Sequence, residues 1–257
     1  MLPIIQIGPV AVQAPGLALL LGLWLALNAA EKEANRIAQL RGAAAGSLSG
    51  DAIYNVALAG IVAGLVGARL AYVLRYLGAY AADPLGILAL NPATLAQTEG
   101  VLIGLLAATV WGARRKLRLW PTLDALAPGV AVMGIAFAVA HLASGDAFGA
   151  PTALPWRIFL WDDYRHPSQV YELLVAAGVW LVWRWQARKA EPAGASFVRV
   201  AAMTAGARLF LEAFRGDSVL LAGGLRAAQV WAWLALAACL AWLSGRGRRE
   251  QEAPPPG

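Results

Sequence analysis

Arginine and glutamate residues at helical spacing are the first groups in this chain that could hold an anion. Arg208, Glu212 and Arg215 are four and three residues apart, which places all three on one stripe of a helix. Two guanidinium groups beside one carboxylate form either a self-neutralising structural ion pair or a pair of cations held toward an anionic ligand. Arg69, with Tyr72 three residues further on along the same face, is a second candidate cation.

A histidine and an aspartate lie close together in the segment AHLASGDAFG, residues 140–149. His141 is one of only two histidines in the chain, and Asp146 comes five residues later. An imidazole can act as a general base near neutral pH, although a histidine at a helix end often only finds a polar partner. The histidines are distant in sequence and the one cysteine, Cys239, lies in an apolar run, so we expect no metal site.

The segment RHPSQVYE, residues 165–172, is the most polar stretch before a long apolar run. Pro167 suits the first turn of a helix, so His166 is expected to lie just before that helix. Gln169 and Glu172 are three residues apart and therefore share a helical face, which needs polar partners. The candidate site residues of this segment are His166, Ser168, Gln169, Tyr171 and Glu172.

The composition is that of a membrane protein. Of 257 residues, 60% are hydrophobic and only 14% are charged, whereas soluble domains have roughly 45–50% apolar and about 25% charged residues. The mean hydropathy is +0.59. A single cysteine excludes a secreted module built on disulfides. We therefore expect an all-α polytopic membrane protein, in which the anion facing an arginine is the head of an anionic phospholipid.

Seven apolar segments are candidates for membrane-spanning helices, since each approaches the ~20 residues that cross a bilayer. They cover about residues 14–30, 52–74, 99–111, 125–143, 167–183, 197–214 and 227–243. Small-residue pairs, Gly60 with Gly64 and Gly100 with Gly104, favour close helix packing. We expect one transmembrane domain over residues 1–245, with residues 144–166 as an outer arm and residues 246–257 as a disordered cytoplasmic tail.

Positive residues mark one side of this predicted bundle. The segments 31–51, 113–124 and 184–199 and the tail after 243 hold three, four, four and three Lys or Arg residues, against five in the opposite loops. Positive loops stay in the cytoplasm, so the N-terminus is expected in the periplasm and the C-terminus in the cytoplasm of a bacterial inner membrane. This distribution accounts for the net charge of +6 without a nucleic-acid partner. Arg69 near its helix end could alternatively extend to the outer head groups.

Several motifs together resemble the prolipoprotein diacylglyceryl transferase family. RHPSQVYE opening a helix after a long outer loop is similar to the family signature. Further likenesses are IGPVAVQAPGL near the start, GARLAY at residues 67–72, GDAFG at residues 145–149, RLFLEAFR at residues 208–215, and Gln229 before the last helix. The resemblance covers most of the chain, and it implies seven spans with the N-terminus outside.

The resemblance also implies an activity and its partners. Such an enzyme takes the diacylglyceryl group from phosphatidylglycerol and transfers it to the lipobox cysteine thiol of a lipoprotein precursor, releasing glycerol phosphate. No cofactor, metal or nucleotide is expected. The chemistry needs a base or a local field to form the thiolate, and cations to stabilise the leaving phosphate.

Several positions depart from the family pattern. Where the family has tyrosine, histidine, arginine and a second tyrosine, this chain has Pro15, Glu99, Ala138 and Thr204. His141 and Ser144 stand at two family asparagines, and Asp146 stands at a glutamate. An alanine side chain cannot replace a guanidinium.

Two interpretations therefore remain open, with a transporter as a third. The chain is a divergent lipid transferase, with His141 or Glu99 as substitute base and Arg69 and Arg208 holding phosphate. Alternatively, it is a non-catalytic lipid-binding or scaffolding subunit of a larger complex with other membrane proteins. A transporter would be favoured by broken helices in paired halves, a pattern that the sequence does not show.

Overall fold

The chain divides into two compact units. The computed structural model describes residues 4–7, 10–82, 84–88, 94–187, 191–221 and 223–252. The first unit combines Met1–Ala30 with Leu123–Gly257, and the second is Glu31–Thr122. The second unit has an interface of its own between two glycine-bearing helices, and the single transmembrane domain over residues 1–245 stays a prediction.

Helices make up most of the described chain, as the composition predicted. The α-helices are α1 (Ala14–Arg41), α2 (Gly50–Arg75), α3 (Leu77–Ala82), α4 (Gln97–Arg114), α5 (Leu119–Ser144), α6 (Ser168–Gln186), α7 (Ala195–Leu211) and α8 (Ala227–Glu252). Short 3-10 helices are η1 (Gly42–Ala45), η2 (Pro84–Leu88) and η4 (Glu212–Phe214). The strands are β1 (Ile4–Ile7), β2 (Val10–Gln13), β3 (Ile158–Leu160) and β4 (Asp163–Arg165).

Each predicted span coincides with a long helix. Among the described residues, α1, α2, α5 and α8 are long and apolar enough to cross a membrane by length and composition. The remaining three, α4, α6 and α7, have 17–19 residues. Passage of all seven through the membrane stays a prediction, as does the orientation of the termini.

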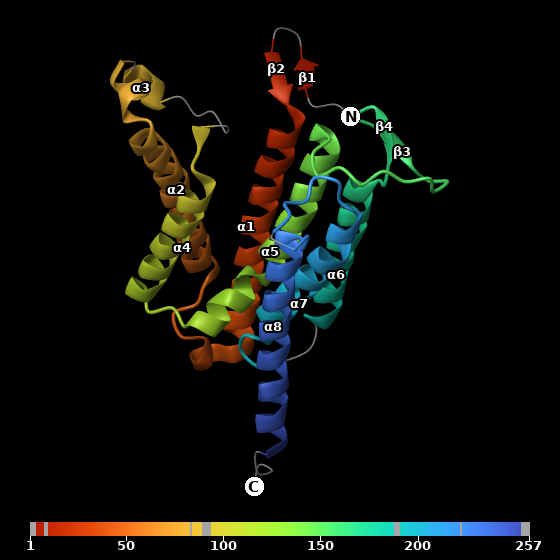
Figure 1. Cartoon of the computed structure of the whole chain (residues 1–257). Coiled ribbons are helices and arrows are strands. Elements are labelled where there is room, and N and C mark those ends of the chain that lie inside the picture. The colour runs from red at the N-terminus through yellow and green to blue at the C-terminus, as the bar shows by residue number, and fades with distance from the viewer. Residues whose placement is uncertain are drawn as a thin grey trace. The chain divides into compact units, whose positions relative to one another are not determined.

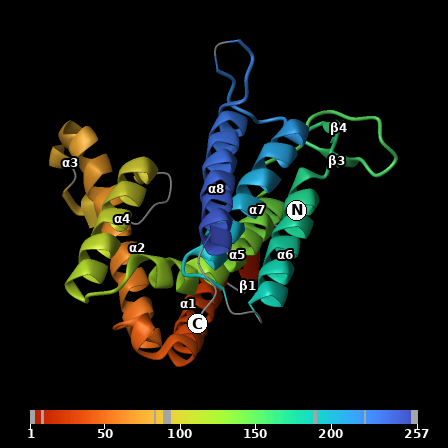
Figure 2. The ribbon, with the colours of Figure 1, turned by 90° about the horizontal axis from the view of Figure 1, so that it is seen from below.

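The core of the first unit lies between α5, α6 and α7. Figures 1 and 2 show α6, α7 and α8 side by side, and α5 lies against α6 and α7. Ala127 and Ala131 of α5 pack against Val179 and Trp183 of α6 and Val200 of α7, and all five are buried. Small residues on α5 face bulky residues on its neighbours, which lets the helices approach closely.

A buried carboxylate fixes the start of α7. Asp124 of α5 is 2% exposed, and its Oδ2 and Oδ1 accept hydrogen bonds from the backbone N–H groups of Gly194 (2.6 Å) and Phe197 (3.1 Å). The first N–H groups of a helix have no partner within the helix, and a negative charge there interacts favourably with the positive end of the helix dipole. Asp124 therefore ties α5 to the beginning of α7.

The second unit is built on the contact between α2 and α4, which pack together as an antiparallel pair (Figure 1). The two predicted small-residue pairs face each other. A Cβ built on Gly100 would lie 2.9 Å from the Gly64 carbonyl oxygen and 2.6 Å from the Cβ of Ala68, and one built on Gly104 would lie 2.7 Å from the Gly60 carbonyl oxygen. Only glycine fits where the backbones come this close.

Two short β-hairpins were not predicted. The strands β1 and β2 pair antiparallel, and so do β3 and β4 within the predicted outer arm. Trp161 and Asp162 connect β3 to β4 with φ angles of 53° and 58°. Positive φ at both central residues is the geometry of a type I′ turn, whose twist matches paired strands. The turn has no glycine, so the usual sequence signal for it is absent.

The predicted disordered tail, residues 246–257, is helical over its first part. Helix α8 continues to Glu252, and residues 253–257 lie outside the described residues. Extending an existing helix is far easier than starting one. The added residues include arginine, glutamate and glutamine, which are good helix formers.

Candidate functional site

A cavity lies within the first unit, between α5, α6 and α7. Its volume is about 110 Å³, several times the roughly 10–15 Å³ that one water molecule needs on this measure. Its walls come from α5, from the turn after α5, from one face of α6, and from α7 with the segment after it. The lining residues are Val130, Ala131, Gly134, Ala147, Ser168, Glu172, Val175, Ala176, Val179, Thr204, Ala207, Arg208, Leu211 and Arg215.

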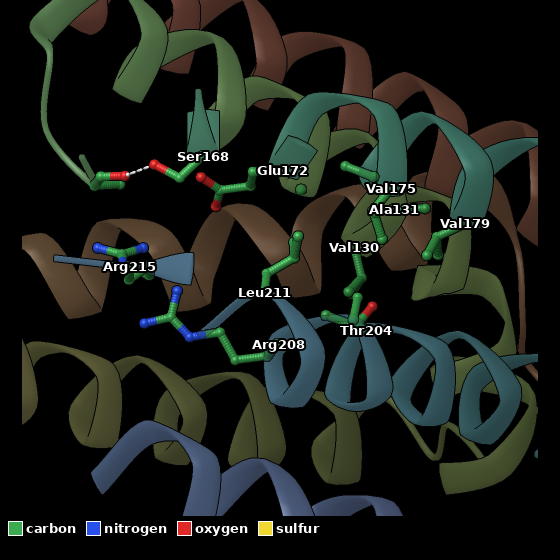
Figure 3. A pocket seen from close by; sticks show the side chains of 14 residues that line it. Val130, Ala131, Ser168, Glu172, Val175, Val179, Thr204, Arg208, Leu211 and Arg215 are labelled. Atoms are coloured by element: carbon green, nitrogen blue, oxygen red, sulfur yellow. Dashed lines mark hydrogen bonds between the residues drawn. The ribbon is translucent and has the colours of Figure 1, made fainter. Parts of the chain in front are cut away.

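The cavity has one charged end and one apolar end. Figure 3 shows Glu172, Arg208 and Arg215 gathered at one end, while Val130 and Val179 lie toward the other. Along α6, the lining residues run from the first residue of the helix to its twelfth, which corresponds to about 16 Å at 1.5 Å per residue. The cavity is therefore amphipathic along its length.

The predicted stripe of Arg208, Glu212 and Arg215 lies at the charged end. Glu212 is 1% exposed, and its Oε2 lies 3.1 Å from Nη2 of Arg208 and 4.0 Å from Nε of Arg215. The prediction that Glu212 holds both guanidinium groups is thus only partly right. Arg215 instead forms a bidentate ion pair with Asp217, in which Nε donates to Oδ1 at 2.8 Å and Nη2 donates to Oδ2 at 2.7 Å.

Charge compensation keeps the Arg215 region ionised. Burial alone would raise the pKa of the Asp217 carboxyl, but hydrogen bonds and charge from Arg215, with a contribution from Arg208, hold that pKa below its ordinary value of 3.8. Burial acts in the opposite direction on Arg215, whose pKa is nevertheless raised by Asp217, Glu212 and Glu172. Opposite charges nearby favour the charged form of each group.

Arg208 is the cation most available to a ligand in this cavity. Its side chain is 42% exposed, whereas that of Arg215 is 13% exposed. Arg208 has one close acidic partner, Glu212, at its Nη2 atom, and a guanidinium group carries five N–H donors. Arg208 can therefore contact an anion in the cavity without leaving Glu212.

His141 and Glu172, predicted separately, form a pair between α5 and α6. Nδ1 of His141 lies 2.8 Å from Oε2 of Glu172. The two side chains are 29% and 23% exposed, and Glu172 also lines the cavity. The predicted polar face of α6 thus finds its partner on a neighbouring helix.

Ser168 and Gln169 hold the turn that follows α5. Ser168 Oγ donates to the carbonyl of Ala147 at 2.6 Å, and Gln169 Nε2 donates to the carbonyl of Asp146 at 3.0 Å. Gln169 is fully buried. Ala147 has a φ of 56°, a left-handed conformation that costs an L-residue about 1–2 kcal/mol. The signature segment thus stabilises a strained turn in the cavity wall.

His166 and Tyr171 pack outside the charged end. The His166 ring lies edge-on to Phe214 and Tyr171, with centroids 5.3 and 6.2 Å away. The Tyr171 hydroxyl accepts a 2.6 Å hydrogen bond from Nε1 of Trp156 in the outer arm. Helix α6 begins at Ser168, one residue later than predicted, and Pro167 occupies its N-cap position. These contacts anchor the arm to α6.

The residues that depart from the family pattern lie in very different environments. Ala138 is fully buried, and its methyl side chain supplies no cation. Thr204 lines the cavity. Asp146 is exposed, and Pro15 is the second residue of α1. Among the described residues, no group of three or more His, Cys, Asp and Glu residues could hold a metal ion.

Arg69 and Tyr72 lie in the second unit. Arg69 is 6% exposed and donates to the carbonyl oxygens of Ile87 (3.0 Å), Thr94 (2.9 Å) and Gly86 (2.5 Å), and to the Thr94 hydroxyl (2.5 Å). Four of its five N–H donors are thus engaged. The geometry gives Arg69 a structural role and supports neither the expected phosphate contact nor extension to head groups.

The aromatic neighbours of Arg69 also differ from expectation. Its guanidinium carbon lies 5.2 Å from the ring centre of Tyr80. Tyr72 packs against Tyr76, with ring centroids 4.7 Å apart. In the described part of the chain, Tyr72 makes no contact with a charged group, so its predicted part in phosphate binding has no support from the structure.

Glu99, the second candidate base, also belongs to the second unit. Its Oε1 lies 2.5 Å from Nη2 of Arg75, and both side chains are exposed by more than a third. Glu99 is thus held in an exposed ion pair, whereas His141 contacts Glu172, which lines the cavity. The geometry therefore favours His141 over Glu99 as the base.

Three residues of the site escaped the sequence analysis. Asp217 follows Arg215 by two residues, and this proximity was the available signal for the ion pair. The strain at Ala147 gave no signal in the sequence, since alanine rarely adopts positive φ. Arg226 was counted only as a loop charge, yet it donates to the carbonyls of Glu212 and Arg215 and to Ser218 Oγ.

The fold and cavity define an integral membrane protein with an amphipathic internal site, and comparison with known proteins identifies its family. The prolipoprotein diacylglyceryl transferase family model matches residues 3–244. The chain belongs to this family, and it is accordingly an integral protein of the bacterial inner membrane.

Curated relatives agree over most of the chain. A phosphatidylglycerol–prolipoprotein diacylglyceryl transferase of Synechococcus elongatus is 28% identical over 269 residues, covering 95% of this chain and 88% of the relative. Proteins of the same name from Synechococcus sp. and Azoarcus sp. are 31% identical over 220 residues and 34% identical over 188 residues. These alignments cover 75% and 69% of this chain, and 77% and 69% of the respective relatives.

Proposed function

We propose that this chain binds phosphatidylglycerol in the cavity and transfers its diacylglyceryl group to the thiol of a lipobox cysteine. The observation that carries the proposal is the division of the cavity into a charged and an apolar end. A phospholipid has the same division, since a charged phosphate is joined to apolar chains. The names of the relatives specify both substrates for those proteins.

The phosphate of the lipid is placed at Arg208, with Arg215 behind it. Arg208 is the more exposed of the two cations, and charge-assisted hydrogen bonds from guanidinium to phosphate are strong and directional. The glycerol and the first carbons of an acyl chain then lie along Val175, Val179 and Val130. Apolar contact there contributes about 25 cal/mol for each Å² removed from water.

Seven spans with a periplasmic N-terminus put the charged end at the outer leaflet. In this orientation α6 starts at the outer face with Ser168, and α7 ends there near Arg208. The hairpin of β3 and β4 then lies at the head-group level, with Trp161 and Tyr164 exposed. Tryptophan and tyrosine prefer this zone of a membrane.

The transfer itself exchanges one bond for another. The acceptor thiol gives its proton to a base, and the sulfur forms a bond to the terminal glycerol carbon of the diacylglyceryl group. The bond from that carbon to the phosphate oxygen breaks, and its electron pair leaves with glycerol phosphate. Arg208 and Arg215 stabilise the negative charge on the leaving group, as preorganised cations do in phosphate chemistry.

The test is a transfer assay with the purified full chain. Vesicles containing phosphatidylglycerol and a peptide with one lipobox cysteine should yield the thioether-linked product, whereas phosphatidylcholine vesicles should not. Arg208→Ala should lower the rate, and Arg184→Ala, which removes an exposed charge from the last turn of α6, should leave it unchanged. Absence of product with well-folded wild-type protein would reject the transfer.

The second candidate is a non-catalytic phospholipid-binding subunit. The buried alanine at position 138 favours it, because the resemblance implies an arginine there and none replaces it. This alternative predicts that phosphatidylglycerol binds and depends on Arg208, while no product forms. Recovery of other membrane proteins with the chain after mild solubilisation would add support for a scaffolding role.

A further inference from the structure

We infer that Glu172 is a positioning residue that orients His141 as the base for the acceptor thiol. The inference rests on the proposed transfer. The two side chains come from α5 and α6, and the Nδ1 to Oε2 distance is 2.8 Å. Glu172 lines the charged end of the cavity together with Arg208 and Arg215, so the pair stands beside the place assigned to the phosphate.

The hydrogen bond determines which nitrogen of His141 can accept a proton. An ionised carboxylate only accepts hydrogen bonds, so Nδ1 must be the donor. In the neutral imidazole, the proton then resides on Nδ1 and the lone pair on Nε2. A carboxylate that fixes a histidine tautomer in this way is a recurring arrangement in nucleophilic catalysis.

The surroundings keep Glu172 suited to this role. Arg215 interacts electrostatically with Glu172, and both side chains line the charged end of the cavity. The His141 ring remains 29% exposed, so the imidazole is not enclosed on all sides. Other charged groups described at this end are Arg208, Glu212 and Asp217, which pair with one another or with Arg215. Arg226 also lies here and donates to backbone carbonyls.

The pair carries the proton through the transfer. The thiol proton moves to Nε2 of His141 as the sulfur attacks the glycerol carbon, and the electron pair of the broken carbon–oxygen bond leaves on glycerol phosphate. The resulting imidazolium is stabilised by the Glu172 carboxylate, which stays unprotonated. The imidazolium then returns its proton to the departing phosphate or to water, and His141 is neutral again.

The other histidine provides an internal reference. His166 packs against aromatic rings and has no carboxylate as a hydrogen-bond partner in the described part of the chain. Because the chain has two histidines, nitrogen NMR of the full-length protein labelled with ¹⁵N-histidine gives two ring systems. His141→Asn removes one of them and assigns both.

The experiment compares tautomer and transfer in three variants at Glu172. Wild-type protein should show His141 protonated on Nδ1, and Glu172→Ala should lose this preference while His166 is unchanged. Glu172→Gln should retain the Nδ1 proton, because its amide oxygen still accepts, but should lose the charge that stabilises imidazolium. Glu191→Gln, which alters an ion pair with Arg199 in the same unit, is the control.

Transfer rates complete the test. General-base catalysis contributes roughly 10²–10⁴-fold, so Glu172→Ala should lower kcat by about 10²-fold or more with little change in the KM for lipid, and Glu172→Gln should lie in between. An unchanged His141 tautomer in Glu172→Ala would overturn the inference, whatever the rates. If wild-type protein transfers nothing, the proposed function fails, and the NMR comparison still decides whether Glu172 orients His141.

Discussion

The two units of this protein each hold a buried or half-buried arginine, and the two arginines are satisfied in opposite ways. Arg69 in the second unit donates to the carbonyl oxygens of Gly86, Ile87 and Thr94 and is almost fully buried. Arg208 in the first unit has one carboxylate partner and a cavity beside it. Both were expected from the sequence to bind phosphate.

The difference shows that burial of a charge does not by itself indicate a ligand site. A guanidinium group whose donors are taken by the backbone holds the chain together, and releasing it would leave several carbonyls without a partner. A guanidinium with unused donors at a cavity can bind an anion at little structural cost. The count of unused donors therefore distinguishes the two roles.

The largest expected loss of stability comes from substitution of Arg69. Arg69→Ala removes the partner of three carbonyl oxygens and one hydroxyl, and each unsatisfied buried group costs about 1–3 kcal/mol. We expect a loss of roughly 3 kcal/mol or more in unfolding free energy, measured by thermal or denaturant unfolding in micelles. Arg75→Ala in the same helix, an exposed ion pair, should cost about 1 kcal/mol or less. Equal losses would contradict the structural role of Arg69.

The next effect sharpens the contrast between the closed interface and the cavity wall. Gly100→Ala places a methyl group 2.6 Å from the Cβ of Ala68, and overpacking typically costs about 1–3 kcal/mol. Gly134 lines the cavity, and its added Cβ would lie 3.8 Å from Ala176. Gly134→Ala should therefore be neutral or raise stability by about 0.4–1 kcal/mol. Denaturant unfolding of both variants would show whether the signs differ.

A smaller effect concerns the ion pair of Arg215 with Asp217. The pKa of Asp217 is lowered in the folded protein, so its stabilising contribution is complete above the ordinary value of 3.8 and disappears as the pH falls through the lowered value. Asp217→Asn should reduce stability at pH 7 by about 1 kcal/mol or less. The difference from wild type should vanish below the lowered pKa. A constant difference over that range would show that the carboxylate charge is not responsible.

The smallest effect is expected at the strained turn. Ala147→Gly relieves a left-handed conformation that costs about 1–2 kcal/mol, but it also frees the unfolded chain by about 0.5–1 kcal/mol. A net gain of a few tenths of a kcal/mol should result. Ala150→Gly is the control, because Ala150 lies in the same segment and has no positive φ. This substitution should lower stability. A loss of stability in both variants would argue against strain at Ala147.

The sequence was sufficient for the features that depend on local pattern. Apolar length located all seven long helices. Glycine spacing predicted close helix packing, and the structure shows that this packing occurs between α2 and α4. Helical periodicity predicted the pairing of Arg208 with Glu212, whereas Arg215 lies beyond the helix in extended backbone. The polar face of α6 was also correct, since Gln169 and Glu172 both found partners.

Features that depend on distant contacts could not be predicted. The role of Arg69 is set by carbonyls 17–25 residues away, and the β3–β4 hairpin lacks the glycine that usually marks such a turn. Asp124 caps a helix that begins some 70 residues later. The pairing of His141 with Glu172 required α5 and α6 to be neighbours, which spacing within one helix does not reveal.

The most direct test of the central claim is phosphatidylglycerol binding to the intact chain. Native mass spectrometry of the micelle-released protein, titrated with phosphatidylglycerol and with phosphatidylcholine, measures the affinity for each lipid. We expect preferential binding of phosphatidylglycerol that weakens by roughly 10–100-fold in Arg208→Ala, equivalent to one charged hydrogen-bonded contact, and that is unchanged in Arg184→Ala. Equal binding by wild type and Arg208→Ala would contradict a phosphate site at the charged end of the cavity.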